Sequence, residues 1–130
     1  MSLAIVHAFV DAINRQSPEE LARLMTEDHV FIDSLGGRVT GRERMKQGWQ
    51  GYFRMVPDYT ITIHESFASE PVFAMVGMAQ GTYAPDGAPK PENRWQIPAA
   101  WRAVVRDALV AEWQVYADNE PMRQIMARSR

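Results

Sequence analysis

The residues best suited to chemistry lie where a short apolar stretch ends. Residues 30–37 read VFIDSLGG, in which Asp33 follows three apolar residues of strand character and precedes a turn with two glycines. A carboxylate at a cavity wall is a reasonable base, because burial raises its pKa toward the range where it can take a proton and return it. Because side chains alternate along a strand, Asp33 points to the same side as Phe31, which we expect to face inward. The stretch therefore predicts that Asp33 reaches a pocket, as a base or as a ligand contact.

Asp33 also has a purely structural interpretation. In an Asx turn, an aspartate accepts hydrogen bonds from backbone N–H groups a few residues further on, here those of Leu35 or Gly36. Asp118, in the stretch YADNEP, poses the same question, because capping of a final helix explains it fully. The sequence leaves both alternatives open for both residues.

Other kinds of chemistry find little support. The three histidines, His7, His29 and His64, lie in separate segments without the spacing of metal ligands. His29 follows two acidic residues, and we expect it to be a solvated turn residue. The chain has no cysteine, which excludes disulfides and thiol nucleophiles, and it has neither a serine-histidine-acid arrangement nor a glycine-rich phosphate loop. We therefore expect no metal and no organic cofactor.

The sequence pattern of the N-terminal half predicts helices on both sides of the VFIDSLGG stretch. Apolar residues at helical spacing predict a first helix over residues 5–13, and the stretch SPEE predicts a short second helix with Ser17 as its cap and Glu20 completing a capping box. A third helix is predicted after the VFIDSLGG stretch. Thr40 would cap it, its apolar stripe includes Trp49, and Pro57 would end it.

From Tyr59 the apolar period changes to two, which predicts strands. Strands are expected over residues 59–64, 72–83, 93–106 and 109–116, followed by a last helix that Asp118 or Asn119 caps. Helices at one end followed by a meander predict an α+β fold, in which a curved antiparallel sheet wraps the helices and leaves an open mouth.

Composition limits the class of protein. The 130 residues are 46% hydrophobic and 23% charged, which predicts one globular domain over residues 1–130. The net charge is −2 without a basic stripe, which argues against a nucleic-acid partner. No apolar run approaches the roughly 20 residues that span a bilayer, so we expect no membrane association and a cytoplasmic location.

The order of elements resembles a known family. Together with HAFVDAINRQSPEELARLMTEDHVFIDSLGGRVTGRERM near the start and EWQVYADNEPMRQIM near the end, it is similar to the nuclear transport factor 2-like superfamily, in its SnoaL-like branch of polyketide cyclases and steroid delta-isomerase relatives. The resemblance implies a cone-shaped, cystatin-like α+β fold with an apolar cavity, and commonly a homodimer through the outer sheet face. It implies little about the reaction.

Carried over residue by residue, the resemblance to ketosteroid isomerases places the proton-transferring aspartate at Asp33. The tyrosine that binds the oxyanion in those enzymes falls at Phe9, and their protonated aspartic acid falls at Ala99 or Ala100, so both donors are missing. A supporting tyrosine falls at Trp49, whose indole N–H is retained. A true steroid isomerase is therefore not expected.

Epoxide hydrolases of the same fold carry an acid two residues after a tryptophan of the last strand. In this sequence Trp113 is followed there by Val115, so that catalytic set is incomplete. Asp118 resembles a position that holds a base in some cyclases of the SnoaL-like branch.

Four tryptophans in 130 residues are more than a small core needs, and a cone lined with indoles suits a flat, largely apolar ligand. We expect an isomerase-type or cyclase-type enzyme that removes a proton beside a carbonyl, with Asp33 as the base and Trp49 as donor to the oxyanion. A non-catalytic small-molecule carrier is the alternative, and a protein-docking module has least support. The residues expected to contact the small hydrophobic ligand are Phe9, Phe31, Trp49, Phe53, Trp101, Trp113 and Asp118.

Overall fold

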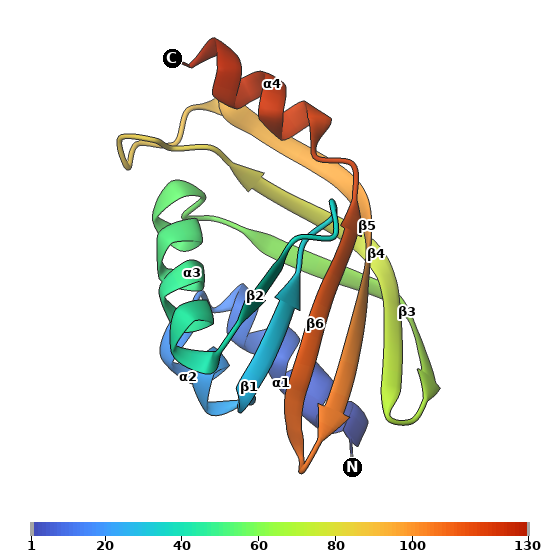
Figure 1. Cartoon of the computed structure of the whole chain (residues 1–130). Coiled ribbons are helices and arrows are strands. Elements are labelled where there is room, and N and C mark those ends of the chain that lie inside the picture. The colour runs from blue at the N-terminus through green and yellow to red at the C-terminus, as the bar shows by residue number, and fades with distance from the viewer. Residues whose placement is uncertain (1, 130) are drawn as a thin grey trace.

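The computed structural model describes residues 2–129, so Met1 and Arg130 of the predicted domain lie outside the described residues (Figure 1). Among its helices, none is long and apolar enough to cross a membrane. The elements along the chain are α1 (Ser2–Asn14), α2 (Pro18–Arg23), β1 (Met25–Ile32), β2 (Arg38–Thr40), α3 (Arg42–Met55), β3 (Thr60–Ser69), β4 (Val72–Thr82), the 3₁₀ helix η1 (Pro91–Asn93), β5 (Arg94–Arg106), β6 (Leu109–Ala117) and α4 (Glu120–Arg128).

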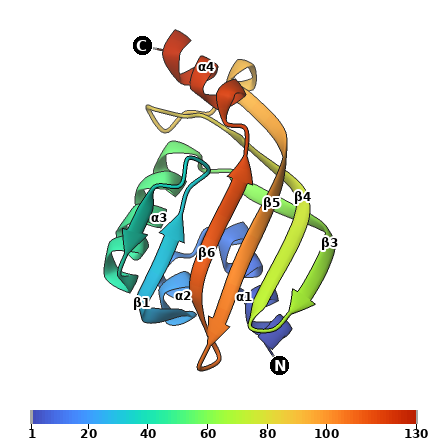
Figure 2. The ribbon, with the colours of Figure 1, turned by 45° about the vertical axis from the view of Figure 1, so that its right-hand side comes forward.

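The strands form one curved, open sheet in the order β2-β1-β6-β5-β4-β3. Figure 2 looks onto its outer face, with α1, α2 and α3 behind it. The α+β class and the four long antiparallel strands after Tyr59 are thereby confirmed. The first strand differs from the expectation, since β1 runs parallel to β6 and pairs with the unpredicted short strand β2.

Helix starts follow the sequence signals in one case and depart from them in another. Ser17 caps α2, and its hydroxyl accepts the backbone N–H of Glu20 at 3.2 Å. Thr40 does not cap α3, because its backbone belongs to β2 and pairs with Val30. Gly41 is the N-cap residue instead, and its φ of 113° lies in the region that favours glycine. The missed strand β2 is the reason for this error.

The hairpin between β5 and β6 follows the predicted reversal. Asp107 and Ala108 both have positive φ, 56° and 60°, which matches the twist of a tight two-residue hairpin. On β5 the alternate residues from Trp95 to Val105 are all buried, so this strand presents its apolar face to the helices, as its pattern predicted.

An irregularity in β1 overturns the expectation for His29. The register with β6 shifts between Met25 and Val30, so the backbone there departs from regular alternation. Glu27 and Asp28 face solvent, whereas His29 turns inward and has no exposed surface. His29 is therefore a core residue, and the adjoining acidic pair misled the sequence interpretation.

Strand β3 also bends. Its register with β4 shifts between Ile63 and Glu65, and Gly77 lies opposite. A Cβ atom on Gly77 would lie 1.8 Å from the carbonyl oxygen of Thr62. Only glycine allows this close approach of the two strands, which bends the sheet around the helices.

Candidate functional site

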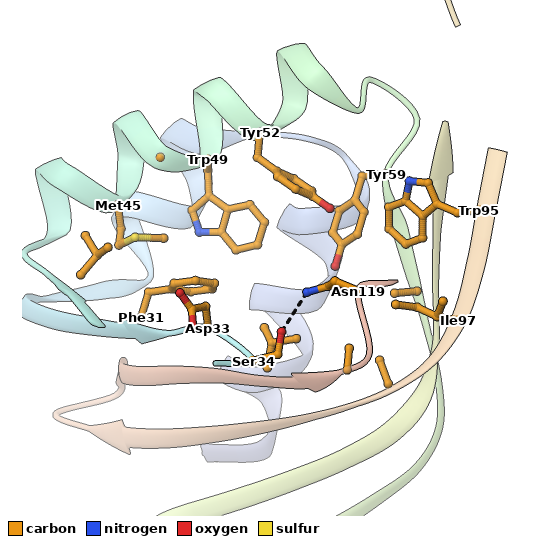
Figure 3. Close-up of a pocket in the computed structure, with 16 residues that line it drawn as sticks. Phe31, Asp33, Ser34, Met45, Trp49, Tyr52, Tyr59, Trp95, Ile97 and Asn119 are labelled. Carbon is orange, nitrogen blue, oxygen red and sulfur yellow. Dashed lines mark hydrogen bonds between the residues drawn. The ribbon is translucent and has the colours of Figure 1, made fainter. Parts of the chain in front are cut away.

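A cavity of about 350 Å³ lies between α3 and the inner face of the sheet (Figure 3). It is lined by Phe31, Asp33, Ser34, Val39, Met45, Gly48, Trp49, Tyr52, Tyr59, Ala79, Trp95, Ile97, Ala99, Val115, Ala117 and Asn119. The lining combines one face of α3 with inward-facing residues of β1, β4, β5 and β6. Asp33 and Gly48 are exposed, which places the opening on their side.

Five aromatic side chains, which we call the aromatic row, dominate this lining: Phe31, Trp49, Tyr52, Tyr59 and Trp95. Most neighbouring rings meet edge to face. Trp49 contacts Phe31 at a centroid distance of 6.2 Å and an angle of 78°, and Tyr52 contacts Tyr59 at 4.9 Å and 90°. Tyr59 and Trp95 follow at 6.0 Å. Such mutual contacts fix each ring, so the cavity is shaped before a ligand enters.

The side chain of Trp49 packs against the core residue Phe53. Its indole stacks on Phe53 with centroids 5.3 Å apart and an angle of 30°. Phe53 does not line the cavity, so it covers one indole face from the core side. The Nε1 atom of Trp49 is buried and has no hydrogen-bond partner among residues 2–129, so this donor is free.

Asp33 lies at the turn after β1. Its Oδ1 atom accepts the backbone N–H groups of Leu35 and Gly37, each at 2.9 Å. These bonds are those of an Asx-type turn, which was the structural alternative for this residue. Asp33 also lines the cavity beside Phe31, and within residues 2–129 both hydrogen bonds to its carboxylate are accepted by Oδ1 and none by Oδ2. One carboxylate oxygen therefore shapes the loop while the other is available.

The polar end of the cavity joins two loops that are far apart in sequence. The side-chain amide of Asn119 donates to the hydroxyl of Ser34 at 2.8 Å. Figure 3 shows the hydroxyl of Tyr59 directed toward the Asn119 side. Asp118 does not line the cavity, and its carboxylate accepts the backbone N–H of Glu120 at 2.9 Å, at the start of α4.

The two tyrosines remain protonated donors. Burial raises the pKa of Tyr52 above its ordinary value of 10, and burial together with the neighbouring Tyr52 raises that of Tyr59. The Tyr52 hydroxyl lies 3.9 Å from the sulfur of Met122 on α4. Tyr59 is therefore the better placed of the two to donate to a ligand.

The residues predicted to contact a ligand divide into two groups. Phe31 and Trp49 line the cavity next to Asp33. The other four aromatic residues, Phe9, Phe53, Trp101 and Trp113, are buried in the core and do not line it. Phe9 packs against Trp113 with ring centroids 4.8 Å apart, which fills the space between α1 and the sheet.

Two positions of the cavity wall carry hydrocarbon side chains where related enzymes carry acids. Of the two positions that the resemblance to ketosteroid isomerases compared with their protonated acid, Ala99 lines the cavity and Ala100 does not. Val115, which the resemblance to epoxide hydrolases compared with one of their acids, also lines the cavity. Neither position offers a carboxyl group to a ligand.

The residues expected to contact a ligand did not include Tyr52, Tyr59, Trp95 and Asn119, all of which line the cavity. Tyr52 follows Trp49 and Met45 at helical spacing, and Trp95 shares the inner face of its strand, so both signals were present in the pattern. Tyr59 and Asn119 lie just outside regular elements, where periodicity gives no direction. Within residues 2–129, no cluster of three or more histidine or acidic side chains is arranged to hold a metal ion.

The model of the SnoaL-like domain family matches residues 6–113. No curated protein matches the chain. Among solved structures, a Shewanella denitrificans protein proposed to be a SnoaL-like polyketide cyclase has a TM-score of 0.83 at 16% identity, with 99% of this chain and 98% of that chain covered.

Two further structures share the fold. An LEH-like epoxide hydrolase from M. tuberculosis has a TM-score of 0.78 at 18% identity, covering 98% of this chain and 90% of its own. A hypothetical protein with a ketosteroid isomerase-like fold from Catenulispora acidiphila, in complex with trimethylamine, has a TM-score of 0.74 at 23% identity, covering 86% of this chain and 83% of its own. These matches confirm the fold that the sequence resemblance implied.

Proposed function

Because this chain belongs to the SnoaL-like domain family, we propose that it binds a small, largely apolar molecule in the cavity beneath α3. The observation that carries this proposal is the aromatic row, whose five rings line a volume of about 350 Å³. Ligand pockets of proteins are typically apolar, with a few polar groups that fix orientation. Here Asp33, Ser34 and Asn119 supply those groups.

A structural relative supports binding of a small molecule by this fold. The Catenulispora acidiphila protein is in complex with trimethylamine. The aromatic row suits a planar or polycyclic ligand better than a branched chain, because flat molecules can stack on its rings or meet their edges.

The test uses two glycines of α3. Gly48 lines the cavity, and a Cβ there would make only ordinary contacts with the flexible side chain of Met45, at 3.6 Å or more. Gly51 lies one turn further on and does not line the cavity, and a Cβ placed on it would have no heavy atom within 4 Å. Gly48→Leu should therefore fill the cavity, and Gly51→Leu is its matched control.

Native mass spectrometry of the purified protein should reveal a retained small molecule. Titration with the neutral dye Nile red should give a fluorescence rise that Gly48→Leu weakens at least roughly tenfold, the equivalent of about 1.4 kcal/mol. Gly51→Leu should bind the dye like the unsubstituted protein. Equal binding by all three proteins would contradict a ligand site in this cavity.

Enzymatic proton transfer is the second candidate, favoured by Asp33, which lines the cavity and whose two turn hydrogen bonds both go to Oδ1. A ligand carbonyl that accepts a hydrogen bond from Tyr59 or Trp49 would have its enolate stabilised, and Asp33 would move the proton between carbons. This is chemistry of the isomerase or cyclase type.

The enzyme and the carrier are separated by hydrogen exchange. We expect NMR in D₂O to show faster exchange of the α-protons of 2-tetralone when the protein is present. Asp33→Asn should abolish the acceleration, whereas Asp118→Asn, which changes the charge equally outside the cavity, should retain it. Binding of Nile red without accelerated exchange would favour the carrier. Epoxide hydrolysis is not proposed, because Val115 replaces the acid.

A further inference from the structure

The charges around the cavity point to a narrower ligand class. Among its lining residues in the described part of the chain, Asp33 is the only one with a charged side chain. The basic residues at the start of α3, Arg42, Arg44 and Lys46, do not line it, and Lys46 lies 3.4 Å from the carboxylate of Glu19. An anionic ligand would thus enter an apolar space with no cationic partner, which is costly.

The aromatic row favours the opposite charge. The faces of tryptophan, tyrosine and phenylalanine rings carry negative partial charge and attract a cation within about 6 Å, and tryptophan does so most strongly. Trp49 lines the end of the cavity where Phe31 and Asp33 lie (Figure 3), and Phe53 stacks on one face of its indole. The polarizable sulfur of Met45 is at the same end. The Trp49 and Phe31 rings, the Met45 sulfur and the Asp33 carboxylate together make this end of the cavity electron-rich.

The arrangement along the cavity is asymmetric. At the mouth are Asp33 and the rings of Phe31 and Trp49, whereas Tyr59, Trp95 and Ile97 lie at the other end. The mouth is partly open to water, since Asp33 is exposed, so a charged head there keeps some hydration. The far end would take an aromatic or aliphatic body.

From this geometry we propose that the cavity selects an amphipathic cation, a ligand with an alkylated or quaternary ammonium head and an aromatic body. The head lies against Trp49 and Phe31 and pairs with the free Oδ2 of Asp33, and the body extends along Tyr52 and Tyr59. This inference rests on the proposed binding function and specifies the charge of its ligand.

The test compares three probes that share a phenyl ring and a tetrahedral head. Phenyltrimethylammonium is the cation, tert-butylbenzene its neutral counterpart, and benzenesulfonate the anion. Calorimetry or quenching of tryptophan fluorescence should show the cation binding at least roughly tenfold tighter than the neutral probe. Benzenesulfonate should bind weakest. Neutral and cationic probes that bind equally, or a tighter neutral probe, would overturn the charge selection.

Two variants test whether Asp33 is the residue that makes the cavity prefer a cation. Asp33→Asn keeps an oxygen that can accept from the turn but removes the charge, and it should weaken binding of the cation several-fold more than binding of tert-butylbenzene. Asp86→Asn is the matched control, because Asp86 is exposed, accepts the N–H of Ala88 at 3.1 Å in a similar turn, and does not line the cavity. An equal loss of cation affinity in both variants would contradict the assignment to Asp33.

The two proposals fail in different ways. If Nile red binds in a manner sensitive to Gly48→Leu but the cation has no advantage, the binding function stands and the ligand is uncharged. If neither the dye nor any of the three probes binds, both proposals are overturned.

Discussion

Acid should destabilise this protein through His29. The imidazole has no exposed surface, and its Nδ1 atom lies 2.7 Å from the carbonyl oxygen of Val110, to which an Nδ1–H group donates. Nε2 is buried without a partner in the described part of the chain, and the ring of Phe9 lies 6.1 Å away. A protonated imidazole would thus carry a buried Nε2–H donor without a hydrogen-bond acceptor.

Burial lowers the pKa of His29 below its ordinary value of 6.5, against smaller opposing effects of the Val110 bond and of Asp28 and Glu112. In the unfolded chain the imidazole gains a proton near pH 6.5, so the unfolded state binds more protons below that pH. The stability that the protein gains from keeping His29 neutral is therefore complete above pH 6.5, and it is lost as the pH falls below that value. One proton gives a slope of at most about 1.4 kcal/mol per pH unit.

The assay is urea unfolding between about pH 7.5 and 5.5, above the range where most carboxylates titrate. Over this interval the free energy of unfolding should fall by up to about 1.4 kcal/mol because of His29. His29→Gln, whose amide can still donate to Val110, should remove that fall. The variants His7→Gln and His64→Gln, at exposed positions, should keep it. An equal fall in His29→Gln and the unsubstituted protein would refute the reasoning.

Three further outcomes are expected. Gly77→Ala should lower the free energy of unfolding by more than about 2 kcal/mol, because the new Cβ clashes with the carbonyl oxygen of Thr62. Gly51→Ala, within helix α3, should instead raise the free energy of unfolding by about 0.5–1 kcal/mol. Thermal melts would measure both changes. Val76 follows the buried Met75 on β4, so its half-buried side chain lies on the outer sheet face. Light scattering should show a dimer that Val76→Lys dissociates, and a monomer at micromolar concentration would contradict this expectation. Asp33→Ala should cost about 1–2 kcal/mol in urea unfolding by removing the turn acceptor, and Asp33→Asn clearly less; equal costs would contradict the role of Oδ1.

The parts of the fold that the sequence predicted are those with local causes. Ser17 and Pro18 start α2 through backbone geometry within one turn. The change of period at Tyr59 marks the first long strand, and alternation alone assigns the buried face of β5. The parallel pairing of β1 with β6 joins segments about 80 residues apart, and no local pattern encodes it.

The site was predicted in part for the same reason. Alternation from Phe31 to Asp33 brought both to the cavity, as expected. By contrast, Phe9 and Trp113 pack against each other instead of lining it, because burial in a core and burial at a cavity wall give the same apolar signal. Asn119 reaches the cavity through its bond to Ser34, a contact between loops that depends on the assembled sheet.

The packing of Phe9 constrains any reaction in this cavity. In the ketosteroid isomerases that the sequence resembles, the first helix provides the oxyanion donor, but here α1 contributes a phenyl ring that Trp113 covers. Ala99 provides no donor on the opposite wall. A carbonyl ligand would therefore have to turn toward the hydroxyl of Tyr59 or the indole N–H of Trp49. The cation proposed above needs no oxyanion donor at all, since its head requires only ring faces and a carboxylate, and the loss of both donors costs such a ligand nothing.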